Sequence, residues 1–353
     1  MAREPLKLGL QLGYWGRGPV PGTLDTVLAA EAMGFDSLWT AEAWGSDALT
    51  PLAWYGSHTT TMKLGQSIIQ MSARTPTATA MALNTLNHLT DGRVIGGLGV
   101  SGPQVVEGWY GQPFSKPLAR TREYIDIMQQ VWARDEPVVS DGPHYPLPYP
   151  ADGPGSVGKG KPLKSITHPH PSPIPIYLAA EGPKNLALAG EKADGWLPIW
   201  MSPDESDWYE TQIQSGMDKV DGKGWDDFGV AAVVPTFVHD DVDQAIDMLR
   251  PNYALYIGGM GARDENYHYE VFARMNDGRY EGDCATIQDL YLEGRKDEAA
   301  ASVPASLVDD VALVGSADRI RDRAQRWEES IVDTLLLGGP WEIIEPAARV
   351  LLA

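Results

Sequence analysis

Residues 174–186 read IPIYLAAEGPKNL, and this stretch decides the fold prediction. The apolar run 174–178 is typical of a short buried strand, and the small residues at 179–182 predict a tight turn. Pro183 then opens a helix, because proline suits the first helical turn. A strand that feeds a helix in this way directs free backbone N–H groups, with about half a positive charge, at whatever lies above it. The stretch therefore predicts either an anion site or an ordinary strand-to-helix connection.

The composition is that of a soluble globular protein. Of the 353 residues, 43% are hydrophobic and 22% are charged. The formal net charge of −20 argues against nucleic acid as a partner, since phosphate binding needs a basic surface. Cys284 is the only cysteine, which excludes an internal disulfide and a cysteine-cluster metal site. The sequence shows neither a membrane-length apolar run nor a signal-peptide pattern, so we expect a cytoplasmic protein without a membrane partner.

Short apolar strands alternate with helices outward from residues 174–186, and this alternation predicts a parallel sheet. No Gly-x-Gly-x-x-Gly turn follows the first strand, which disfavours an open dinucleotide-binding sheet. Eight strand–helix units instead predict a single α/β domain over residues 1–353, a (β/α)8 TIM barrel with insertions. The strands are expected near residues 6, 37, 63, 94, 174, 195, 228 and 333.

Two segments interrupt the alternation. Residues 136–173 are rich in proline and glycine, which predicts an irregular excursion. Residues 240–301 read as a mainly helical insertion, with a break expected at the glycine-rich stretch 253–261. His168 and His170 have the spacing of a metal pair, but no carboxylate accompanies them in their proline-rich loop, so we predict no metal site.

The side chains just past the strand ends are the candidates for chemistry, because ligands bind there in a parallel barrel. Few of them are acids or bases. Glu42 is compatible with three roles: a general acid or base, a hydrogen-bond partner of a cofactor ring, or a salt-bridged rim residue. A hydrolase would need two carboxylates beside a cleft, for which Glu42, Glu107 and Glu181 are available. A redox barrel needs mainly placement and polarity from the protein, which suits this set better.

Short motifs are spread over nearly the whole chain: GFDSLWTAE at 34–42, LGQSII at 64–69, RTP at 74–76, LTDGR at 89–93 and ADGW at 193–196. In this order they resemble the bacterial luciferase-like superfamily, and within it the coenzyme F420 (deazaflavin) oxidoreductases of actinobacteria. The resemblance implies a homodimer that transfers a hydride between the deazaflavin and a small or medium organic carbonyl, alkene or alcohol. An FMN-dependent monooxygenase of the same fold is the alternative, and a barrel hydrolase and a non-catalytic deazaflavin-binding protein also remain open.

The resemblance also implies site residues. A bulge with a non-prolyl cis peptide at Ser67-Ile68 would back the deazaflavin ring, and the coenzyme phosphate would meet backbone amides around Gly182. Glu42 and Gln11 are the candidates to polarise substrate or coenzyme. The candidate cofactor contacts, including strand-end positions, are Ser67, Ile68, Gln70, Gly99, Ser101, Gln104, Glu107, Ala180, Glu181, Gly182 and Pro183.

Three positions depart from better-known relatives. Glu42-Ala43 stands where sugar-phosphate and alcohol dehydrogenases of the superfamily carry an Asp-His pair. Gln104 replaces their glutamate after the fourth strand, although Glu107 is close by. Gln11 replaces the first-strand glutamate of the one-carbon folate reductases. We therefore expect neither a sugar-phosphate dehydrogenase nor a methylene-folate reductase, and the substrate stays open.

Overall fold

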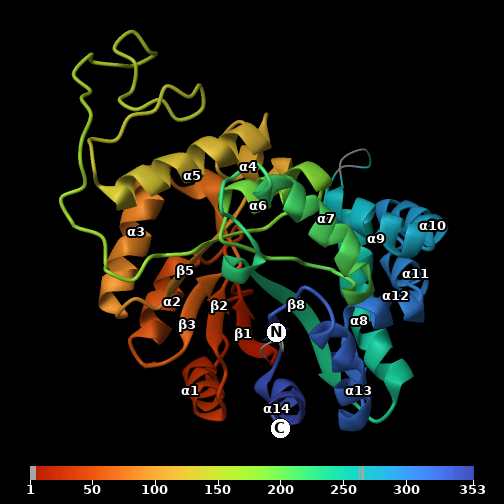
Figure 1. Cartoon of the computed structure of the whole chain (residues 1–353). Coiled ribbons are helices and arrows are strands. Elements are labelled where there is room, and N and C mark those ends of the chain that lie inside the picture. Colours follow the sequence, from red (N-terminus) through yellow and green to blue (C-terminus); the bar gives the residue numbers. More distant parts are fainter. Residues whose placement is uncertain (1–4, 262, 264–265) are drawn as a thin grey trace.

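The computed structural model describes residues 5–261, 263 and 266–353. Figure 1 shows the strands in the interior of the molecule, with helices around them. The strands of this part of the chain are β1 (Lys7–Gly13), β2 (Ser37–Thr40), β3 (Lys63–Gln66), β4 (Ile69–Gln70), β5 (Val94–Gly99), β6 (Ile176–Leu178), β7 (Gly195–Trp196), β8 (Gly229–Val238), β9 (Leu313–Gly315) and β10 (Thr334–Gly338).

Eight parallel strands close into a barrel in the order β1-β2-β3-β5-β6-β7-β8-β10. Closure is made by β10, in which Thr334 pairs with Lys7 of β1 on one side and with Ala231 of β8 on the other. The predicted TIM barrel is confirmed. Two short strands lie off this ring: β4 continues β3 beyond a bulge and pairs with β5, whereas β9 pairs with the far end of β8.

Helices pack around the barrel, and local sequence signals set several of their ends. Gly34, at φ 102°, ends the first helix, as expected of glycine at a helix C-terminus. Thr75 Oγ1 accepts from Ala78 N, and Ser316 Oγ accepts from Arg319 N, which caps two other helices. The surrounding helices are α1 (Thr23–Met33), α2 (Leu49–Gly56), α3 (Pro76–Leu89), α5 (Pro117–Ala133), α6 (Pro183–Lys192), α7 (Ser206–Met217), α13 (Ala317–Glu328) and α14 (Trp341–Leu351).

Two aromatic side chains, Trp39 and Tyr177, fill much of the barrel interior. Each requires a glycine on a neighbouring strand. A Cβ atom at Gly65 would lie 2.3 Å from Trp39 Cε3, and one at Gly195 would lie 2.5 Å from Tyr177 Cε1. The two ring centroids are 6.1 Å apart. The interior is therefore a packed core rather than a channel.

The helical insertion comprises α8 (Val242–Gly259), α9 (Tyr267–Gly278), α10 (Glu281–Leu292) and α11 (Lys296–Ala301), followed by α12 (Ala305–Val311). It has its own apolar core, separate from that of the barrel. The expected break at 253–261 begins later than predicted, because α8 continues through residues 253–259 and ends at Gly259. Tyr253, Ala254 and Ile257 recur at helical spacing and are buried, so packing of this face holds the helix together.

The excursion between α5 and β6 contains turns and isolated bridges, and it projects beyond α3 and α5 in Figure 1. Its end is fastened to α3, where Asn84 Nδ2 donates to the carbonyl of His168 at 3.1 Å. His170 Nε2 lies 3.6 Å from Asp91 Oδ1. Over the described residues, no three side chains form a metal-binding group. Nor is any helix there both long and apolar enough to span a membrane.

Candidate functional site

The bulge between β3 and β4 contains the predicted cis peptide at Ser67-Ile68. Backbone hydrogen bonds fix it on one side: Ser67 N donates to Thr40 O at 2.7 Å, and Glu42 N donates to Ile68 O at 3.1 Å. On the other side, a Cβ atom at Gly99 would lie 2.7 Å from Ile68 Cδ1. Ile68 thus packs directly over a glycine of β5. Segments from β2, β4 and β5 together hold the bulge in place.

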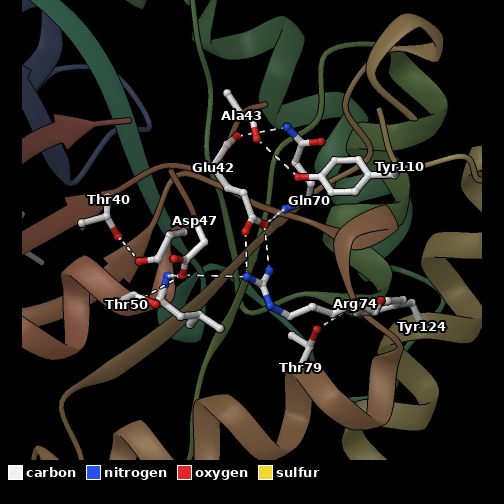
Figure 2. A network of polar contacts seen from close by, with 12 residues as sticks. Thr40, Glu42, Ala43, Asp47, Thr50, Gln70, Arg74, Thr79, Tyr110 and Tyr124 are labelled. Atoms are coloured by element: carbon white, nitrogen blue, oxygen red, sulfur yellow. Dashed lines mark hydrogen bonds and ion pairs between the residues drawn. The ribbon is translucent and has the colours of Figure 1, made fainter. Parts of the chain in front are cut away.

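Glu42, in the loop after β2, binds residues on the far side of this bulge and holds it in place (Figure 2). Its carboxylate accepts from both terminal nitrogens of Arg74, at 2.9 and 2.8 Å, and from Gln70 N at 3.0 Å. Gln70 Nε2 in turn donates to Glu42 O at 3.0 Å. Glu42 is 7% exposed. Hydrogen bonding to Glu42 outweighs burial and raises the pKa of Arg74, so the guanidinium stays charged. Of the three roles left open, this geometry is that of a salt-bridged residue.

Two further residues extend this network of contacts. Asp47 Oδ1 lies 3.8 Å from Arg74 Nη2 and also accepts from Thr50 N at 2.8 Å at the start of α2. Tyr110 donates its hydroxyl to Ala43 O at 3.3 Å, which connects the loop after β5 with the loop after β2. Burial, and then the charge of Glu42, raise the pKa of Tyr110. Neither contact carries a sequence signal, since the partners come from separate strand–helix units.

Three glutamine side chains at strand ends have buried polar atoms without a partner among the described residues: Gln11 Oε1, Gln66 Nε2 and Gln70 Oε1. The network orients two of these amides. Gln66 Oε1 accepts from Gly97 N at 3.2 Å, and Gln70 Nε2 is bound to Glu42 O. Gln66 therefore presents a free donor and Gln70 a free acceptor. Leaving such atoms unpaired costs about 1–3 kcal/mol each, which a ligand with matching groups would recover.

The turn after β6 has the geometry that an anion site requires. Among the described residues, no backbone carbonyl accepts from the N–H groups of Glu181, Gly182 or Lys184. Gly182 lies in extended backbone at φ −84° and ψ 156°, and a Cβ atom there would meet nothing within 4 Å. Ala180 is buried, and its carbonyl accepts from Trp196 Nε1 at 2.8 Å, which fixes the base of the turn.

The helical insertion reaches this turn. His268 of α9 places Nδ1 2.8 Å from Glu181 Oε1. The ring of Tyr256 from α8 meets the His268 imidazole edge-on at 4.9 Å. Nothing in the sequence singles out His268 or Tyr256, because neither belongs to a motif and both lie far along the chain from Glu181.

The remaining candidates are more dispersed. Ser101 is in the left-handed region at φ 59°, directly after β5. Gln104 and Glu107 are exposed on the short helix α4 (Pro103–Gly108), where Glu107 Oε1 accepts from Phe114 N at 3.3 Å. Glu42, Glu107 and Glu181 thus have different partners, and no contact among described residues joins any two of them.

A hollow of about 410 Å³ lies at the opposite end of the barrel, where Lys7, Asp36, Lys63 and Thr334 begin their strands or precede them. Ligands of parallel barrels bind at the carboxyl ends of the strands, and the amino-terminal end serves stability. We therefore assign the candidate site to the bulge and the turn after β6.

A family model described as luciferase-like monooxygenase matches residues 11–334, from the end of β1 to the start of β10. The chain belongs to the luciferase-like monooxygenase family. This chain is similar to the putative coenzyme F420-dependent oxidoreductase Rv3520c of Mycobacterium tuberculosis. It is 53% identical over 348 residues, which cover 98% of this chain and 99% of the relative.

Solved structures show the same luciferase-like fold. The coenzyme F420 dependent tetrahydromethanopterin reductase from Methanopyrus kandleri superposes with a TM-score of 0.78 at 22% identity, covering 99% of this chain and 98% of that one. An F420-dependent secondary alcohol dehydrogenase, solved in complex with an F420-acetone adduct, superposes with a TM-score of 0.74 at 18% identity, covering 98% and 99%. At these identities the two likenesses establish the fold alone.

Proposed function

We propose that this chain is a coenzyme F420-dependent oxidoreductase, which moves a hydride between the deazaflavin and a small or medium organic carbonyl, alkene or alcohol. The observation that carries the proposal is the 53% identity, over 98% of the chain, to a relative named as a putative F420-dependent oxidoreductase.

The residues present fit the coenzyme. A deazaflavin has a flat ring with C=O and N–H groups on one edge, and a phosphate on its side chain. The free donor of Gln66 and the free acceptor of Gln70 match such an edge, and Ile68 packed on Gly99 gives an apolar backing. The amides on either side of Pro183 match the phosphate. Ser101, Gln104 and Glu107 stay predicted contacts.

When bound, the deazaflavin would supply or accept the hydride, and the protein would supply placement and polarity. Glu42 is occupied by Arg74 and the Gln70 amide, so we assign it the positioning of the bulge rather than proton movement. Gln11 keeps a free amide oxygen at the end of β1, which suits the orientation of a donor group on substrate or coenzyme.

We also propose a homodimer. The neighbouring helices α2 and α3 expose large apolar side chains, with Trp54 59%, Met81 61% and Leu89 75% exposed. Such side chains on adjacent helices favour burial against a second copy. Light scattering on the purified protein tests this: a monomeric mass would contradict it. The cytoplasmic location stays a prediction from the sequence.

A binding titration of the purified protein with coenzyme F420 and, separately, with FMN tests the function. We expect saturable binding of the deazaflavin and much weaker binding of FMN, followed by reduction or oxidation of F420 in a screen of ketones, enones and alcohols. Preference for FMN would favour the monooxygenase alternative, and binding of neither would revive the hydrolase alternative. Tight F420 binding without any turnover would indicate a non-catalytic deazaflavin-binding protein.

A further inference from the structure

The contact between His268 and Glu181 joins the helical insertion to the turn after β6. Nδ1 and Oε1 are 2.8 Å apart, and the two side chains are 22% and 19% exposed. Their approach is not aligned as a hydrogen bond, so the contact is electrostatic in character. Among the ion pairs of the described residues, His268 is the only cation that reaches Glu181.

The position of Glu181 makes this contact informative. Glu181 directly precedes Gly182, in the turn whose N–H groups have no carbonyl partner in the part of the chain that the structure describes. A carboxylate there opposes any anion bound to the turn, and the chain as a whole carries a net charge of −20. An imidazolium in contact with that carboxylate offsets its charge locally, so the turn accepts an anion more readily when His268 is protonated.

Few other ionisable groups face the pair. Tyr256 packs against His268 from α8 and interacts with Tyr14 from the loop after β1. Tyr209 of α7 interacts electrostatically with Glu181. Burial raises the pKa of both Tyr256 and Tyr209 to about 12, so these two phenols stay neutral between pH 5.5 and 8.5.

The nearby permanent charges do not titrate in that range either. Arg274 donates to Tyr209 Oη at 2.8 Å and lies 3.7 Å from Glu205, so its charge is already offset. Lys184, in the first turn of α6, is exposed to solvent. Among the side-chain types in this region, histidine is the one that ordinarily changes charge near neutral pH, and His268 is in contact with the carboxylate of the turn.

We propose that His268 is a binding residue of the anionic part of the coenzyme, supplied by the helical insertion, and that Glu181 positions it. This inference rests on the proposed function. It assigns the insertion a role in coenzyme recognition: protonated His268 cancels the charge of Glu181, and its loss leaves an uncompensated carboxylate in the anion turn.

The test measures the dissociation constant for F420 by equilibrium dialysis between pH 5.5 and 8.5. The same measurement is made with a second ligand, the deazaflavin without its phosphate side chain. The ratio of the two dissociation constants is then compared across the pH range, because any titration of the ring affects both ligands and cancels in this ratio. For the wild-type protein we expect this ratio to shift about tenfold in favour of F420 as the pH falls. A tenfold change corresponds to about one pKa unit of coupling between protonation and binding of the anion. His268→Asn should bind F420 weakly at every pH, and Glu181→Gln should bind it tightly at every pH.

His239→Asn is the matched control, because this histidine contacts the Asp241 carbonyl at 2.9 Å outside the site. It should retain the wild-type pH dependence, and thermal unfolding should show that all variants fold. A flat wild-type ratio, or an unchanged slope in His268→Asn, would overturn the inference while leaving the proposed function standing. Absence of F420 binding to wild type at any pH would instead remove the proposed function.

Discussion

At the residue scale, the Glu42–Arg74 pair determines how firmly the bulge is held. Replacing Glu42 with Gln keeps its shape but leaves the guanidinium of Arg74 with one neutral acceptor. We expect a loss of about 3 kcal/mol in the free energy of unfolding, because the pair is bidentate and the Glu42 side chain is only 3% exposed. Urea denaturation measures the change.

The Lys63–Asp36 pair supplies the control for that experiment. Its side chains are 49% and 28% exposed, and the nitrogen and oxygen are 3.3 Å apart. Lys63→Gln should cost less than about 1 kcal/mol, since exposed ion pairs contribute little. Equal losses in the two variants would show that the Glu42 pair is no more than a surface contact.

A substitution at Gly182 should affect coenzyme binding without affecting the stability of the fold. Val fits the extended backbone at this position, and its side chain would enter open space, so Gly182→Val should leave the melting temperature within about 2 °C of wild type. The same side chain would cover the free amides, and F420 affinity should fall at least about tenfold. An unchanged dissociation constant would remove the anion turn from the coenzyme site.

The sequence predicted site residues only where they belong to a local motif. The turn at Gly182 follows from its local sequence, whereas the cis peptide at Ser67-Ile68 follows from the resemblance to the family, and both lie where expected. The partners of Glu42 and Glu181 could not be predicted, because Arg74 and His268 come from other strand–helix units and only the closed barrel brings them together.

At the element scale, the same distinction applies. Strands of the barrel were predicted because each has an apolar run and is followed by a helix. β9 was missed because its three residues pair with the part of β8 outside the barrel. Helix α8 continues through residues 253–259, where an interruption was expected, because packing overrides the local preference there: Gly258 is buried against Tyr291 of α10.

Cys284 makes the stability of the insertion measurable. It is fully buried in α10, and burial raises the pKa of its thiol to about 12. At pH 8 the native thiol should react with Ellman's reagent at least about a hundredfold more slowly than in urea, because both the thiolate fraction and access are small. Rapid reaction of the native protein would show that α8 to α10 open readily.

At the scale of the whole molecule, the barrel depends on the fit between Trp39 and Gly65. A methyl group at Gly65 would lie 2.3 Å from a rigid indole ring, so Gly65→Ala should cost about 3 kcal/mol. Gly182→Ala, which enters open space, should be nearly neutral in the same denaturation experiment. Comparable losses would contradict the packing described for the interior.

That fit also constrains how the protein varies in evolution. Because the indole occupies the space that a side chain at position 65 would need, the two positions should change together rather than one at a time. Family members with a small residue at position 39 are free to carry a larger one at 65, and those with tryptophan are held to glycine. An alignment of relatives should therefore show position 65 as glycine wherever position 39 is tryptophan, and varied elsewhere.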